Sequence, residues 1–223
     1  MPKRAILLPI SGLLGAVVKD LYKKCEADLQ AAFPDKKVRC IGTPFPNAPF
    51  PLLAQKHLAR FPEEQVIRSW SRMVGFAIRA KPIIEDADIV VCRRLGLDIV
   101  LYAAACEGWD DRKVTALRIH HSMVKNTLVG ELGIQIPDGY IIPQAANGAC
   151  GEILLRTFPE LEKLPSGVLE KFLKRQKSVI EENYFNSSTG QNRPFFVDAS
   201  KPIPEMFADI VGFVRKNIEL HPQ

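Results

Sequence analysis

Short apolar runs that alternate with longer helical patterns are the feature that most constrains how this chain can fold. The runs with the length and composition of buried strands are Ala5–Ile10, Val38–Thr43, Asp88–Arg94, Tyr140–Ala145 and Phe195–Asp198. Buried strands separated by helices are typical of βα units around a mostly parallel sheet. The pattern therefore predicts a three-layer α/β fold, in which helices flank a five-stranded parallel sheet.

Helical periodicity fills the intervals between these runs. Apolar residues recur at steps of three and four residues from Val18 to Phe33, and Pro34 then ends the first helix. Further helices are expected at Glu63–Ile84, at two places between Leu97 and Leu132, at Gly167–Tyr184 and from about Pro204 onward. No internal repeat or linker interrupts the pattern, so residues 1–223 are predicted to form a single domain.

A proline-rich segment follows the second predicted strand. Four prolines lie between Thr43 and Pro51, and because proline suits neither a helix interior nor a central strand, the segment is predicted to be a stiff loop. The loop leaves the sheet at the carboxyl end of a strand, where α/β proteins bind their ligands.

Charge and cysteine content narrow the class of protein. Lys and Arg number 30 against 25 Asp and Glu, and this mild excess suits an anionic ligand such as a nucleotide without indicating a nucleic-acid binder. The five cysteines are widely spaced and form no Cys-x-x-Cys pair, so neither a disulfide framework nor a zinc site is predicted. His120 and His121 are adjacent and do not share a helix face, so no metal site is expected there. Reduced thiols favour a cytoplasmic protein.

The apolar segment near the N-terminus has two interpretations. Lys3 and Arg4 precede a run that resembles a secretory signal, but Pro9, Gly12 and Gly15 interrupt it and no cleavage pattern follows. No run reaches the roughly 18 apolar residues of a membrane span. We therefore expect a strand and a glycine turn here, and no membrane partner.

That glycine turn has the layout that places phosphate at a helix N-terminus. Gly12 and Gly15 lie between a predicted strand and a predicted helix. A working phosphate loop has the pattern G-x-x-x-x-G-K-[ST], in which lysine contacts the phosphate and the hydroxyl holds magnesium. Val17, Val18 and Lys19 stand at those last three places. The turn is either a degenerate phosphate loop or an ordinary βα turn.

Several landmarks along nearly the whole chain resemble thymidylate kinase, a P-loop nucleoside monophosphate kinase. In the family's order and spacing, Gly12–Ala16 is similar to the phosphate loop and Thr43–Pro46 to the Thr-Arg-Glu-Pro loop. Ser71-Arg72 is similar to the Asp-Arg helix, Lys81-Pro82 to the Lys-Pro pair and Asp88–Arg94 to the third strand. Pro137–Ile142 is similar to the fourth strand, and Val197–Ser200 to the closing Ile-Asp-Ala-Ser motif.

The resemblance implies a nucleotide site built mainly from the acceptor side. By this likeness Arg72 and Arg94 bind the phosphate of a nucleoside monophosphate, a task that suits the guanidinium fork. Thr43 begins the loop beside that site, and Trp70 lies near the place where the family stacks an aromatic ring on the base. The other interpretation of these side chains is structural: ion pairs for the two arginines and core packing for Trp70.

The departures from the family pattern fall on the residues of catalysis. Val18 stands in place of the loop lysine, and Arg93 stands in place of the third-strand aspartate. Pro44-Phe45 takes the place of the Arg-Glu pair, and Gln144 takes the place of the aspartate that ends the fourth strand. Phosphoryl transfer depends on charge neutralisation by lysine, arginine and magnesium. The sequence therefore predicts no catalytic residue and no metal ligand, and the turn with Gly12, Gly15 and Lys19 is predicted to be a degenerate phosphate loop.

Three functions are consistent with this pattern. The first is an inactive or nearly inactive thymidylate kinase-like protein that binds a nucleoside monophosphate or acts through a protein partner. The second is an active deoxynucleoside monophosphate kinase that uses ATP and magnesium with Lys19 as a displaced loop lysine. The third is a structural subunit of a larger assembly. Family resemblance and the apolar helix face that includes Trp70 also predict a homodimer.

Overall fold

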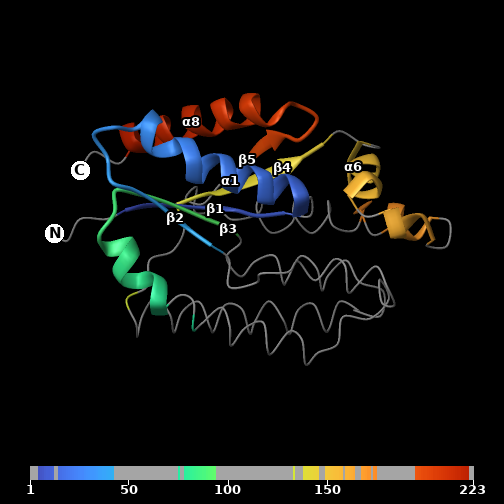
Figure 1. Cartoon of the computed structure of the whole chain (residues 1–223), viewed down its shortest axis with the longest axis horizontal. Helices are drawn as coiled ribbons and strands as arrows, with labels where there is room; N and C mark the ends of the chain where they lie inside the picture. Colours follow the sequence, from blue (N-terminus) through green and yellow to red (C-terminus); the bar gives the residue numbers. More distant parts are fainter. Residues whose placement is uncertain are drawn as a thin grey trace.

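The computed structural model describes residues 5–12, 15–42, 75, 78–93, 133, 138–145, 149–157, 159–163, 167–171, 173–174 and 194–220. The labelled elements are β1 (Ile6–Ile10), α1 (Gly15–Ala32), β2 (Val38–Ile41), β3 (Ile89–Arg93), β4 (Tyr140–Gln144), α6 (Ala149–Thr157), the 3₁₀ helix η1 (Pro159–Lys163), β5 (Pro194–Asp198) and α8 (Ile203–Leu220) (Figure 1).

The strands form one parallel sheet, as predicted. Their order is β2-β3-β1-β4-β5, and every paired strand runs parallel to its neighbour. The pairing of β1 with β3 is continuous, from Ile6 opposite Ile89 to Ile10 opposite Arg93. The pairing of β1 with β4 has a single registered position, Ile10 opposite Ile141. Backbone hydrogen bonds from Asp138 N to Leu7 O and from Ser11 N to Ile141 O join β4 and its preceding residues to β1 on either side of this pair.

Helices cover both faces of the sheet. Helices α1 and α8 pack against each other on one face, and a helical segment at residues 78–85 lies on the opposite face (Figure 1). This segment is the end of the predicted Glu63–Ile84 helix, most of which lies outside the described residues. The three-layer α/β architecture is thereby confirmed.

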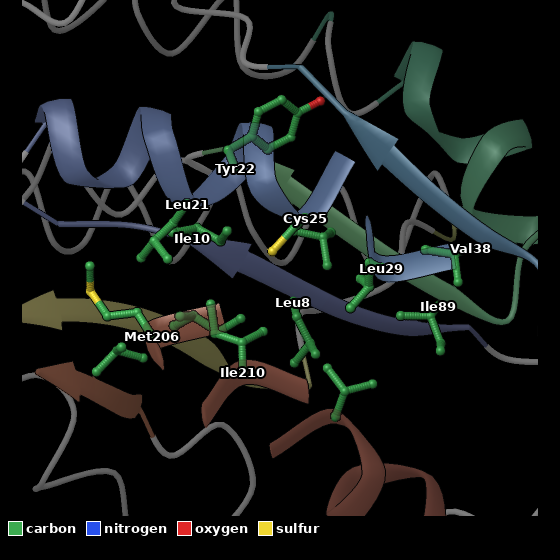
Figure 2. Close-up of a cluster of buried hydrophobic side chains, with 14 of the residues drawn as sticks. Leu8, Ile10, Leu21, Tyr22, Cys25, Leu29, Val38, Ile89, Met206 and Ile210 are labelled. Carbon is green, nitrogen blue, oxygen red and sulfur yellow. The ribbon is translucent and has the colours of Figure 1, made fainter. Parts of the chain in front are cut away.

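The larger core lies between the sheet and the pair α1 and α8. Figure 2 shows Leu8 and Ile10 of β1 beside Leu21 of α1 and Ile210 of α8, all of them buried. On the opposite face, Leu7 packs in a second cluster with residues of β3 and of the segment 78–85. Because β1 is buried on both faces, it reads as a continuous apolar run, which is the pattern of a central parallel strand.

Two aspartates close the sheet at its amino edge. Asp138 precedes β4; its Oδ2 accepts a hydrogen bond from the backbone N of Leu7 at 2.8 Å, and its own N donates to Leu7 O at 2.9 Å. Asp88 precedes β3, and its Oδ2 accepts from the backbone N of Lys37 at 2.7 Å. Both carboxylates thus satisfy backbone donors that the ladders leave unpaired. These acidic groups join strands, far from the carboxyl edge where ligands of such sheets bind.

No helix in the part of the chain that the structure describes is long and apolar enough to cross a membrane.

Candidate functional site

The candidate site lies at the carboxyl edge of the sheet, where the ends of the parallel strands come together. Ser11 and Gly12 follow β1, Arg93 ends β3 and Gln144 ends β4. Arg93 stands opposite Ile10 in the register, so it lies one position from the turn that leads into α1. The β1–α1 turn and Arg93 therefore form the middle of this edge.

The β1–α1 turn depends on a glycine conformation. Gly12 has a φ of 128°, a region that residues with a Cβ rarely adopt. A Cβ added there would lie 3.5 Å from Ile142 Cγ2, an ordinary contact, so the backbone angle rather than lack of space requires glycine. The preceding Ser11 donates its backbone N to Ile141 O at 2.9 Å, whereas its buried Oγ has no hydrogen-bond partner in the described parts of the protein.

Residue 18 faces the core and not the turn. Val18 is 1% exposed and belongs to the apolar cluster that includes Leu21 and Cys25. A lysine in this direction would place its charge among apolar side chains, which is strongly unfavourable. Lys19 is exposed to solvent. Because neighbouring helical residues point in directions about 100° apart, the Lys19 side chain does not follow the direction of Val18.

Arg93 packs its guanidinium against an aromatic ring. Its Cζ lies 6.0 Å from the centroid of the Tyr22 ring on α1, within the range of a cation–π contact. Tyr22 is 6% exposed, and Figure 2 shows its hydroxyl directed away from the buried cluster. Burial, together with the nearby Glu26, raises the pKa of Tyr22 well above its ordinary value, and Arg93 opposes this shift. Tyr22 is therefore a neutral phenol whose ring lies beside the Arg93 guanidinium.

The turn after β5 carries a carboxylate that is already engaged. Asp198 Oδ1 accepts hydrogen bonds from Ser200 N at 3.0 Å and from Ser200 Oγ at 2.6 Å. These two bonds hold the pKa of Asp198 below its ordinary value. In the same turn, Lys201 Nζ donates to Asp209 Oδ2 at 2.9 Å, and this bond raises the pKa of Lys201. The group is a polar turn that leads into α8.

Magnesium does not fit the residues described at the ends of β1, β3 and β4. Mg²⁺ prefers carboxylate and phosphate oxygens, whereas these ends present the hydroxyl of Ser11, the guanidinium of Arg93 and the amide of Gln144. Within the described ranges no three His, Cys, Asp or Glu side chains are grouped so that they could hold a metal ion. Arg93 also repels a cation at this edge.

Burial keeps two of the described thiols protonated. Cys25, Cys40, Cys92 and Cys150 form no disulfide. Burial raises the pKa of Cys25 to about 12 and that of Cys40 to about 11, so both are protonated at neutral pH. A protonated thiol is neither a good nucleophile nor a metal ligand.

The sequence-predicted site residues divide into two groups. Gly12 lies in the turn, Gly15 is the first residue of α1, and Lys19 is exposed on that helix. The other four, Arg72, Arg94, Thr43 and Trp70, lie outside the described residues. Sequence reasoning missed the contact of Arg93 with Tyr22, although a basic residue at a strand end and a tyrosine on the facing helix were both visible.

The fold of this chain is similar to that of two solved kinase structures. No protein-family model and no curated protein match this chain. Among solved structures, it is similar to thymidylate kinase from Candida albicans, with 13% identity, a TM-score of 0.55 and coverage of 96% of this chain and 92% of that one. It is also similar to deoxyadenosine kinase from M. mycoides, solved with dCMP and a flexible dCDP, with 12% identity, a TM-score of 0.54 and coverage of 94% and 99%. The chain therefore has the fold of nucleoside and nucleoside monophosphate kinases.

Proposed function

We propose that this protein is a nucleoside monophosphate kinase-like protein that binds a nucleotide and transfers phosphate poorly or not at all. The observation that carries the proposal is the burial of Val18 in the core, at the position where the phosphate-loop pattern requires lysine. The fold provides the scaffold for a nucleotide, while this turn lacks the lysine that contacts the transferred phosphate in a working phosphate loop.

The loss of catalysis follows from several substitutions at one edge. Removing one preorganised charge-stabilising group typically lowers kcat by about 10²- to 10³-fold. By resemblance, Val18 replaces the lysine, and Arg93 and Gln144 replace two aspartates. Even if these effects are less than additive, little turnover is expected to remain.

The retained binding is proposed for the acceptor side. By resemblance, Arg72 and Arg94 bind the monophosphate beside the loop that begins at Thr43, and Trp70 lies near the base. Charge-assisted bonds from guanidinium to phosphate are among the stronger hydrogen bonds in proteins, and these two arginines do not depend on a working donor site. We also propose that the protein forms a homodimer or acts through another protein.

Two measurements on the purified protein test this proposal. The first is a coupled assay of ATP- and magnesium-dependent phosphorylation of thymidine monophosphate, with no measurable turnover expected. A kcat near 1 per second, within the ordinary range of enzymes, would overturn the proposal. The second is calorimetric titration with thymidine monophosphate and with ATP separately, in which the monophosphate is expected to bind more tightly.

The same titrations separate the other functions. Turnover with ATP supports an active kinase. Absence of binding by both nucleotides supports a structural subunit. An Arg72→Ala variant is expected to weaken monophosphate binding about tenfold or more, with little change in melting temperature.

A further inference from the structure

We infer that Arg93, supported by the ring of Tyr22, supplies the positive charge at the carboxyl edge of the sheet, so that an anionic ligand binds there without a divalent metal. This inference rests on the proposed function, in that it takes the edge to be a nucleotide site. It concerns how the negative charge of a phosphate is neutralised in that site.

The side chains around the β1–α1 turn suit an anion better than a metal ion. Among the described ends of β1, β3 and β4, the one formally charged side chain is that of Arg93, and it is a cation. A metal-dependent phosphate site needs acidic oxygens to hold the metal, and those oxygens would add negative charge next to the phosphate. Here the protein side chain is positively charged, and its guanidinium can donate paired hydrogen bonds directly to phosphate oxygens.

Arg93 also lies close to the turn and to the N-terminus of α1. Arg93 stands opposite Ile10 across a continuous parallel ladder, and Ser11 and Gly12 follow Ile10 at once. Helix α1 begins three residues after Gly12, and the N-terminus of an 18-residue helix adds partial positive charge in the same region. The hydroxyl of Ser11 at this turn is completely buried and has no hydrogen-bond partner within the described residues. Buried hydroxyls are usually hydrogen-bonded, and an anionic ligand at this turn would supply an acceptor for this one.

Arg93 also contacts a buried aromatic ring. Arg93 is half-buried, and its guanidinium lies 6.0 Å from the centroid of the buried Tyr22 ring. Glu26 on the next turn of α1 lies near Tyr22 and is exposed, so its charge is screened by solvent. Holding a long side chain near its working position lowers the conformational cost of binding a ligand. Tyr22 is thus a positioning residue for Arg93.

The test measures nucleotide affinity by calorimetry with thymidine monophosphate and with ADP as probes, each in EDTA and in magnesium chloride. Wild-type protein is compared with Arg93→Gln, which removes the charge, and with Arg93→Lys, which keeps it. Arg39→Gln is the matched control, because Arg39 lies on the neighbouring strand β2, opposite Val90 and therefore three positions nearer the amino edge. Tyr22→Leu removes the ring and Tyr22→Phe keeps it, and the melting temperature of each variant shows whether it is folded.

The inference predicts that at least one probe binds the wild type with the same Kd, within about twofold, in EDTA and in magnesium. Arg93→Gln should weaken that binding about tenfold or more in both buffers, whereas Arg39→Gln should change it less than twofold. Arg93→Lys should recover part of the affinity, and Tyr22→Phe should bind more tightly than Tyr22→Leu.

Three results would overturn the inference. They are an affinity that magnesium raises tenfold or more, an affinity that a folded Arg93→Gln variant leaves unchanged, and the absence of binding by both probes. The first two leave the proposed function standing, because a nucleotide still binds. Phosphoryl transfer with magnesium would instead refute the proposed function, whatever the affinity of the Arg93 variants.

Discussion

Truncating Val18 tests whether the side chain of residue 18 is part of the core or faces the β1–α1 turn. Val18→Ala removes two methyl groups from a side chain that is 1% exposed. At about 0.8 kcal/mol for each buried methylene-sized group, the transfer cost is about 1.6 kcal/mol, and the cavity left in the core raises the total to about 2–3 kcal/mol. For a chain of this size that loss lowers the melting temperature by about 4–12 °C.

The assay is thermal unfolding followed by circular dichroism, with urea unfolding to give the free energy. Lys19→Ala is the matched control, since Lys19 is the next residue of the same helix turn and is exposed. Its free energy of unfolding should change by no more than about 0.5 kcal/mol. Both substitutions raise helix propensity, and Val→Ala raises it more than Lys→Ala, so a larger loss of stability at residue 18 is due to burial.

The Val18→Lys variant tests whether a lysine at residue 18 restores phosphoryl transfer. The variant should be destabilised at least as much as Val18→Ala and should gain no ATP-dependent phosphorylation of thymidine monophosphate, because Arg93 still stands at the edge. The reasoning is refuted if Val18→Ala costs no more than Lys19→Ala. It is equally refuted if Val18→Lys folds with wild-type stability and transfers phosphate.

Three further predictions follow from the described structure. Ser200→Ala should raise the pKa of Asp198 toward the ordinary value of about 3.9 in a carboxyl NMR titration, and an unchanged titration would show that Ser200 does not lower it. Because the pKa of Asp198 is lowered in the folded state, the stabilisation by Ser200 is present at neutral pH and is lost as the pH falls through that pKa. The free energies of unfolding of wild type and variant should therefore converge in acid. Alkylation of Cys40 in the folded protein should accelerate about tenfold per pH unit up to about pH 10, because the pKa of Cys40 is raised to about 11; a plateau near pH 8.5 would contradict this. The predicted homodimer should give about 50 kDa by light scattering, twice the 24.9 kDa of one chain, and a mass of one chain at micromolar concentration would contradict it.

The strands could be predicted from sequence because a parallel strand that is buried on both faces appears as a continuous apolar run. The first predicted strand, Ala5–Ile10, differs from β1 by one residue, and the predicted Phe195–Asp198 differs from β5 by one residue. The second prediction, Val38–Thr43, extended past the end of β2 at Ile41. The local sequence pattern therefore predicted where the strands lie and was less exact about the residue at which each strand ends.

The strand order and the site contacts were not predicted, because they depend on segments far apart in the sequence. The first two strands are not neighbours, since β3 lies between β1 and β2. Likewise, no local pattern brings Arg93 to the ring of Tyr22; that contact exists because α1 crosses back over β1 and β3. The position of Val18 was noted only as a missing lysine, and its burial explains why a lysine does not suit the place.

The register of the sheet decides which strand ends are held together at the carboxyl edge. Five consecutive registered pairs join β3 to β1, so the backbone of Arg93 is held beside the end of β1. Gln144 lies on β4, which is joined to β1 through one registered pair and through the hydrogen bonds of Asp138 and Ser11. A substitution that loosens the pairing of β4 should therefore displace Gln144 from the β1–α1 turn more than it displaces the backbone of Arg93.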